Sequence, residues 1–230
     1  MMKRIFACIL TLGMTIILLS GHNSNLIPAE ISYAAEETEG AEGAITIDDE
    51  YLIPDSIGWC TYYVVVATNN TGSDISISAD FVAKDGSGNV LKKVNDYSDA
   101  VKKGQQFILY GQFLNKEIAN ASAYEYEYSI NPTDRCAYTS VSLDTKNIGD
   151  GVEVSATNYS EFDVQSVGVR TVFMKNGRAV AFDTVNIADA GITFHGGSTN
   201  SQIIGTRAGD YDDMIITYTT VSNHSMAEDL

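Results

Sequence analysis

The stretch Ala67-Thr68-Asn69-Asn70-Thr71-Gly72-Ser73-Asp74 recurs in altered form as Ala156-Thr157-Asn158-Tyr159-Ser160-Glu161-Phe162-Asp163. Each copy ends one alternating apolar run and begins another, which reaches Lys84 in the first copy and Lys175 in the second. An Asp-Gly or Asn-Gly turn then follows in both. Because such turns join short antiparallel strands, the sequence predicts one small β domain written twice, about 90 residues apart.

Alternation of apolar and polar residues predicts further strands in both halves. Ile75, Ile77, Ala79 and Phe81 alternate with polar residues, which is typical of a half-buried strand. Residues 60–68 are apolar on both faces, so we expect that strand at the centre of a sheet. No long amphipathic helical stretch follows the N-terminal segment, which argues against a parallel α/β fold. The predicted fold class is all-β, with two tandem β-sandwich domains after an N-terminal signal peptide.

The N-terminus has the pattern of a secretion signal. Met1-Met2-Lys3-Arg4 is basic, and the apolar run at 5–19 is short for a membrane-spanning helix. Ser32-Tyr33-Ala34 supplies the small residues that cleavage requires, so a cut after Ala34 or Ala35 is predicted, with a retained signal anchor as the alternative. After cleavage no membrane span is expected. We therefore expect a secreted, extracellular protein, either free or associated with the cell envelope.

The remainder of the chain divides by composition. Residues 35–44 are small and acidic, as in disordered spacers, and Pro and Asx residues follow the last strand of the first copy. The predicted organisation is a signal peptide at 1–34, a spacer at 35–44, a first sandwich at 45–131, a linker at 132–137, a second sandwich at 138–222 and a polar tail at 223–230.

The charge of the chain limits its partners. The formal net charge is −16, from 30 acidic and 14 basic residues. Phosphate binding requires clustered Lys and Arg, so nucleic acid and anionic membranes are disfavoured. Solubility is the simplest explanation of the acidity, and binding of a cation or a basic partner is the alternative.

Both copies share an order of elements: an apolar strand ending in Thr-Asn, a strand running into Asp-Gly or Asn-Gly, a return strand, a Gly before a strand, and a closing strand that contains alternating Tyr in the first copy. This order resembles the FxLYD-type domains of secreted and surface proteins of Gram-positive bacteria, over about 45–130 and 138–221. The closing element is only approximate, at Tyr124–Tyr128 and 215–218. The resemblance implies immunoglobulin-like or fibronectin-III-like sandwiches with a binding or spacer role, and it brings no catalytic residues.

Two cysteines follow the predicted signal peptide, Cys60 and Cys136. In an immunoglobulin-like sandwich the first strand can run parallel beside the last, which would place the start of the second strand near the end of the last one. A Cys60–Cys136 disulfide is therefore predicted, and the secretory route permits it. The alternative is two independent buried thiols.

Aromatic residues allow two interpretations. Trp59 and the tyrosines would suit a sugar-stacking platform. Tyr124, Tyr126 and Tyr128 share one face of a strand, however, and that face is more typical of a core or an interdomain contact.

No catalytic or metal-binding pattern emerges. The acidic clusters 48–50 and 210–213 lack the spacing of a calcium loop, so we interpret both as solvated turns. His195 and His224 lack a nucleophile signature or a metal motif around them. We therefore expect no catalytic residue, no metal and no cofactor. The predicted function is a non-catalytic surface interaction, adhesion or spacer module whose ligand is unknown, with a carbohydrate-binding protein of the cell envelope as the alternative. Its partner would be an extracellular protein or glycan.

Overall fold

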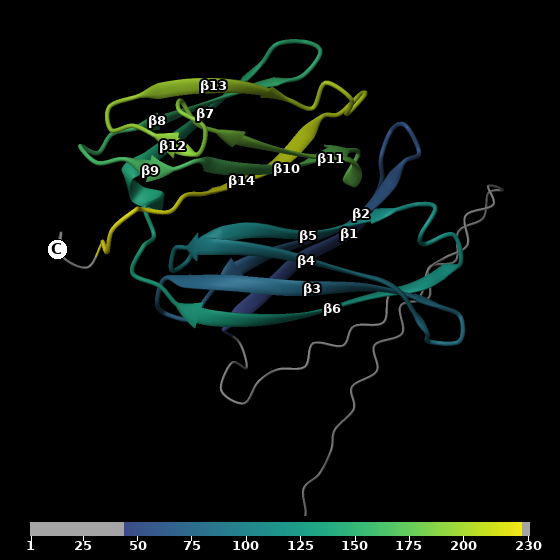
Figure 1. The fold of residues 1–230 in the computed structure, drawn as a ribbon. Helices are drawn as coiled ribbons and strands as arrows, with labels where there is room; N and C mark the ends of the chain where they lie inside the picture. Colours follow the sequence, from purple (N-terminus) through teal and green to yellow (C-terminus); the bar gives the residue numbers. More distant parts are fainter. Residues whose placement is uncertain (1–43, 227–230) are drawn as a thin grey trace, which may run out of the picture.

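A computed structural model describes residues 44–226 of the chain. The predicted signal peptide, nearly all of the predicted spacer and the last four residues lie outside the described residues. Figure 1 shows two layered β structures, one stacked on the other. The 3₁₀ turn η1 (Tyr138–Ser140) is the only helical element among the described residues, so the prediction of an all-β sandwich fold is confirmed.

Six strands build the first sandwich. They are β1 (Ile45–Pro54), β2 (Cys60–Asn69), β3 (Ile75–Asp85), β4 (Val90–Val101), β5 (Gln106–Leu114) and β6 (Ala121–Pro132). One sheet has the order β1-β2-β5 and the other has the order β4-β3-β6, with all neighbours antiparallel.

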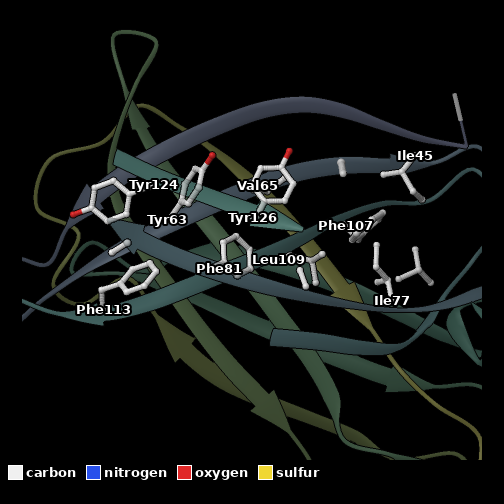
Figure 2. Close-up of a cluster of buried hydrophobic side chains, with 14 of the residues drawn as sticks. Ile45, Tyr63, Val65, Ile77, Phe81, Phe107, Leu109, Phe113, Tyr124 and Tyr126 are labelled. Atoms are coloured by element: carbon white, nitrogen blue, oxygen red, sulfur yellow. The ribbon is translucent and has the colours of Figure 1, made fainter. Parts of the chain in front are cut away.

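The core of the first sandwich lies between these two sheets and is rich in aromatic rings. Tyr63 from β2 makes edge contacts with Phe81, Tyr124 and Tyr126 of the opposite sheet, at ring-centroid distances of 5.7, 6.1 and 5.7 Å. Figure 2 shows these rings pointing into the space between the sheets. The Glu50 carboxylate at the rim accepts hydrogen bonds from the hydroxyls of Tyr63 and Tyr126. Burial raises the pKa of Glu50, and these two hydrogen bonds oppose the rise.

The second sandwich repeats this arrangement of two facing sheets, with mostly shorter strands. Its strands are β7 (Val141–Asn147), β8 (Val152–Asn158), β9 (Val164–Gln165), β10 (Val167–Lys175), β11 (Arg178–Ile187), β12 (Thr193–Phe194), β13 (Thr199–Ile204) and β14 (Asp213–Thr219). One sheet has the order β13-β8-β7 and the other β11-β10-β14, while β9 and β12 form a short ribbon. Its core is a separate buried cluster that includes Val154, Phe173 and Phe194.

The duplicated Thr-Asn stretch has the same structure in both copies. Asn69 and Asn158 are fully buried at the ends of β2 and β8. The amide nitrogen of Asn69 donates to the carbonyls of residues 73, 101 and 102, and that of Asn158 donates to those of 162 and 194. Gly104 and Gly197, both at positive φ, donate from their backbone N–H to the carbonyls of Asn69 and Asn158 respectively. In each copy the asparagine side chain thus links the end of its own strand to two later loop segments, at the point where the hydrogen bonds between strands stop.

A third apolar cluster joins the two sandwiches. The outer face of the β1-β2-β5 sheet packs on the β11-β10-β14 sheet, as the stacking in Figure 1 shows. The buried members of this interdomain cluster are Ile53, Val64, Val66, Ile108, Val172, Met174 and Phe182. This packing explains why β2 is apolar on both faces, and β2 does lie at the centre of its sheet, as predicted.

The predicted disulfide is wrong. Cys60 and Cys136 are free, buried thiols. Cys60 begins β2, whereas Cys136 packs against Ala100, next to the carbonyl of residue 101 that accepts from Asn69 at the other end of β2. A strand of this length spans about 30 Å at roughly 3.3 Å per residue. The prediction assumed the wrong strand direction. β6 runs antiparallel to β3, so the end of β6 lies beside the start of β3, near Asn69 at the end of β2 and far from Cys60 at its start. Burial raises the pKa of the Cys136 thiol to about 11, so it is unreactive near neutral pH.

Candidate binding grooves at the interdomain interface

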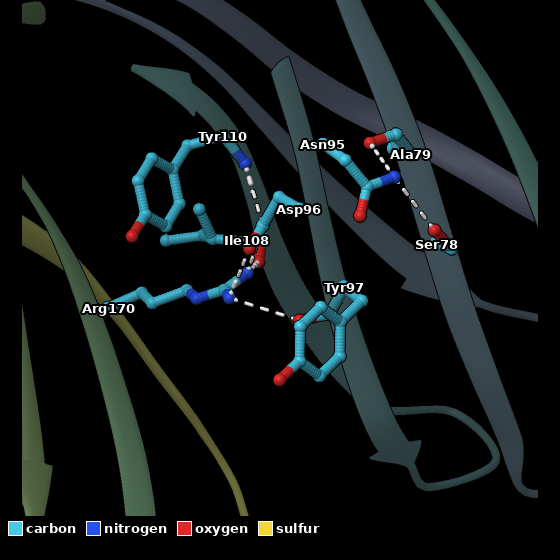
Figure 3. Close-up of polar contacts among 8 residues, drawn as sticks. All are labelled: Ser78, Ala79, Asn95, Asp96, Tyr97, Ile108, Tyr110 and Arg170. Atoms are coloured by element: carbon cyan, nitrogen blue, oxygen red, sulfur yellow. Dashed lines mark hydrogen bonds and ion pairs between the residues drawn. The ribbon is translucent and has the colours of Figure 1, made fainter.

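Beside the apolar cluster, Arg170 makes a group of polar contacts between the two sandwiches. Arg170 of β10 donates to both carboxylate oxygens of Asp96 on β4, at 2.6 and 2.8 Å, and to the backbone carbonyls of Tyr97 and Ile108 (Figure 3). Its guanidinium carbon also lies 5.0 Å from the ring centroid of Tyr110. Arg170 and Asp96 retain only 18% and 13% of their side-chain exposure. The bidentate pair therefore orients one sandwich on the other.

The same contacts cover an open sheet edge. β5 lies at the edge of its sheet, and its unpaired backbone groups would otherwise be available to another chain. Asp96 accepts from the backbone N–H of Tyr110, and Arg170 donates to the carbonyl of Ile108. Burial raises the pKa of Asp96, while the charge of Arg170 and the N–H donors oppose the rise.

Two grooves open along this interface, and they share no lining residue. The first, here called the Trp59 groove, has a volume of about 380 Å³. Its inner wall carries the rings of Tyr62, Phe173 and Phe182, and Tyr62 meets Phe182 edge-on at 5.2 Å. The β1–β2 loop forms one side, with Ile57 and Trp59, and residues 205–208 of the second sandwich form the other.

The loop that carries Trp59 is held from several directions. The carboxylate of Asp55 accepts from the Trp59 backbone N–H at 2.7 Å. Asn115 donates through its backbone N–H to the Trp59 carbonyl at 3.0 Å and through its side chain to the Gly58 carbonyl at 2.9 Å. Despite this restraint, Ile57 and Trp59 remain 65% and 58% exposed. Their apolar side chains are thus presented to solvent by a loop with a defined shape.

The second groove, here called the Tyr97 groove, also has a volume of about 380 Å³. It is lined by β4 and β5 of the first sandwich and by β10, β11 and the end of β14 of the second. Tyr97 and Ile192 are exposed at 60% and 75%. The rest of its lining is mainly polar.

The predicted tyrosine face is not a surface platform. Tyr124 and Tyr126 are 7% and 9% exposed and belong to the core of the first sandwich (Figure 2). Tyr128 packs against that core. The interpretation of this face as core packing is confirmed. Among the described residues, the exposed aromatic side chains are instead Trp59, Tyr97 and Tyr159.

The acidic clusters serve internal contacts. The interpretation of residues 48–50 as a turn is wrong, because they lie inside β1, where Asp48 sits at a register shift and accepts from Thr68 and Gln106. Residues 210–213 precede β14 and begin it, and Asp210 and Asp212 pair with Lys175. Within residues 44–226, no three His, Cys, Asp or Glu side chains gather as a metal site would require.

The two histidines lie apart from both grooves. His195 Nδ1 lies 3.0 Å from the carboxylate of Asp163, which raises the pKa of the imidazole. His224 contacts Ser222 and the edge of the Phe162 ring. In the part of the chain that the structure describes, no helix has the length and apolarity needed to cross a bilayer.

Comparison with known proteins shows no family. No family model matches the chain, and no curated protein matches it. Among solved structures, red sea bream transglutaminase aligns over 77% of this chain and 31% of its own, with 9% identity and a TM-score of 0.25. A glycoside hydrolase family 2 β-glucuronidase aligns over 73% of this chain and 20% of its own, with 13% identity and a TM-score of 0.18. The chain thus spans less than a third of either protein's length, and such low similarity carries no functional argument.

Proposed function

We propose that this chain is an exported, non-catalytic interaction module whose Trp59 groove receives a segment of a partner protein outside the cell. The observation that carries the proposal is the exposure of Ile57 and Trp59 on a loop fixed by Asp55 and Asn115. Tryptophan is enriched among the residues that dominate binding energy in protein interfaces. A loop already held in one shape also loses little conformational entropy on binding.

Charge indicates the kind of partner. Asp55 and Asp183 line the groove together with Arg207, and the whole chain carries a net charge of −16. A partner segment that places an apolar side chain beside Trp59 and Lys or Arg residues next to it would match both features. The acidic surface would also speed the encounter with such a segment.

A rigid spacer role is compatible with this proposal. The interdomain cluster and the Arg170–Asp96 pair would keep the two sandwiches in one relative orientation. The groove, which has walls from both sandwiches, would then keep its shape.

Glycan binding at the cell envelope is the second candidate, and the exposed ring of Trp59 favours it. A flat indole ring can stack on the apolar face of a sugar as readily as it can pack on a protein side chain.

Selection from a random peptide display library on the immobilised protein tests the first candidate. We expect enriched peptides with an apolar residue flanked by Lys or Arg. Their affinity should fall at least tenfold for Trp59→Ala and stay unchanged for Tyr159→Ala, which removes a ring that is 72% exposed away from both grooves. Equal binding to wild type and Trp59→Ala would refute the proposed site, and glycan-array binding that depends on Trp59 would favour the second candidate.

Export is tested separately. N-terminal sequencing of the protein recovered from culture medium should find Ala35 or Glu36 as the first residue. Recovery of only the full-length chain, in the membrane fraction, would instead support a retained signal anchor.

A further inference from the structure

The end of the described chain, residues 220–226 and here called the C-terminal strap, lies against the linker that joins the two sandwiches. Val221 of the strap forms an antiparallel bridge with Cys136 of the linker. The backbone N–H of Ser222 donates to the carbonyl of Arg135 at 2.8 Å, and the Arg135 Nε donates to the carbonyl of Ser222 at 2.9 Å. The linker is thus hydrogen-bonded to a segment that is remote in sequence.

The other edge of the C-terminal strap pairs with the second sandwich. Gln165 of β9 donates from its backbone N–H to the carbonyl of Val221 at 2.8 Å, and Val164 forms an antiparallel bridge with Ser222. Val221 and Ser222 are 7% and 0% exposed. The strap therefore lies between the linker and β9, and it attaches the linker to the second sandwich.

The first sandwich contacts the same joint. Ala100 of β4 forms a small buried cluster with Cys136 and Val221. The linker is also hydrogen-bonded to the first sandwich, because the backbone N–H of Thr133 donates to the carbonyl of Asp74 at 3.0 Å. Detachment of the C-terminal strap would therefore uncover the Cys136 thiol and remove the hydrogen bonds that the strap makes to the linker.

We propose that the C-terminal strap is a releasable fastening of the interdomain joint. While the strap is docked, the two sandwiches keep one orientation; when it detaches, the linker is freed and the sandwiches can move apart. Detachment leaves both cores intact, because the buried residues of each core lie outside the strap. The interdomain cluster and the Arg170–Asp96 pair would then have to hold the two sandwiches together alone, and contacts between domains of one chain commonly permit relative motion.

Both grooves would respond to this release. Thr220 and Val221 of the strap line the Tyr97 groove, and the Trp59 groove has walls from both sandwiches. The strap would thus control the shape of the Trp59 groove from the opposite end of the interface. The proposal concerns the joint itself and does not depend on what either groove binds.

Labelling of the two thiols in the native protein tests whether the strap detaches on its own. Cys136 packs against the strap, whereas Cys60 is 0% exposed at the far end of β2 and serves as the internal control. In the wild type we expect an aromatic disulfide reagent to modify Cys136 at least tenfold faster than Cys60. Equal rates would mean that the strap opens only when the whole chain unfolds, which would overturn the proposal.

Two variants test whether the strap sets the orientation of the sandwiches. Val221→Asp places a carboxylate in the buried cluster and should drive the strap off the linker, and deletion of residues 221–230 removes most of the strap. We expect either change to speed the labelling of Cys136 at least a further tenfold and to leave Cys60 protected. The radius of gyration from small-angle X-ray scattering should rise by about a tenth or more.

Val90→Asp is the matched control, because Val90 of β4 is 59% exposed, and it should change neither the labelling nor the radius of gyration. The proposal is overturned if both strap variants label Cys136 at the wild-type rate, or if labelling accelerates while the radius of gyration stays unchanged. Loss of Cys60 protection in both variants would show that the strap is required for folding and is not a releasable fastening.

Discussion

Replacing Asn69 with Asp would test the structural reason for the duplicated Thr-Asn stretch. The amide nitrogen of Asn69 donates to the carbonyls of Ser73, Val101 and Lys102 at 2.9, 3.1 and 3.1 Å. Its oxygen accepts from the backbone N–H and the hydroxyl of Thr71, at 3.1 and 2.8 Å. A carboxylate can still accept, but it has no hydrogen to donate and would face three carbonyl oxygens.

The expected cost follows from these contacts. Two amide hydrogens are lost, each worth about 1 kcal/mol, and a charge is added at a fully buried position, which costs a further 2 kcal/mol or so. We therefore expect Asn69→Asp to lower the free energy of unfolding by about 4 kcal/mol. Part of this loss should be recovered on acidification, because a protonated carboxyl regains one donor and the folded state then binds a proton more tightly than the unfolded chain.

Urea unfolding followed by the fluorescence of the single tryptophan measures this cost. Asn158→Asp should cost a similar amount, because Asn158 has the equivalent role in the second copy. Asn70→Asp is the matched control, since Asn70 is exposed and its side chain makes a single hydrogen bond to Thr46; its cost should stay below about 1 kcal/mol. If Asn69→Asp is no more destabilising than Asn70→Asp, the buried amide does not hold these loops together.

Three further variants probe the interface, a tight turn and an exposed ion pair. Arg170→Ala should cost about 3 kcal/mol in urea unfolding, because it leaves the largely buried Asp96 carboxylate without its partner, and a loss below about 1 kcal/mol would contradict that role. Gly205→Ala should cost at least about 2 kcal/mol, because its φ is 73° and a Cβ would lie 2.3 Å from a buried aromatic ring; an unchanged thermal midpoint would show that the turn relaxes freely. Asp163→Asn should lower the pKa of His195 in an NMR titration, since that carboxylate raises it, and an unchanged pKa would show that the pair does not form in solution. In the wild type the pair's contribution to stability is present below about pH 6.5 and is lost as the pH rises through the raised pKa.

The repeat could be recognised from sequence because its determinants are local. Both copies have a Thr-Asn pair at the end of an apolar strand and a Gly before a later strand. They recur because in both copies the Asn side chain binds the carbonyls of the neighbouring loops. The structure places Gly104 and Gly197 against Asn69 and Asn158 in the same way. The two-sided apolar pattern of residues 60–68 also indicated a central strand, although it did not reveal that the second face meets the other sandwich.

The features that required long-range information were missed. β4 continues to Val101 through a polar segment at residues 95–99, which gave no signal for a strand. Arg170 alternates with apolar residues, as an ordinary solvent-facing charge would, so its pairing with Asp96 could not be read from spacing. The cysteine prediction failed because the direction of the last strand, which decides where Cys136 lies, is set by sheet pairing across the whole sandwich. Both grooves are lined by residues of both sandwiches, so neither could be predicted from local sequence patterns.

Each sandwich has its own core, and we expect the interdomain cluster to join the two into one cooperative structure. Differential scanning calorimetry of the chain tests this expectation most directly. We expect one transition, with a calorimetric enthalpy equal to the van't Hoff enthalpy. Two resolved transitions, one of them reproduced by the first sandwich expressed alone, would show that the two sandwiches unfold independently.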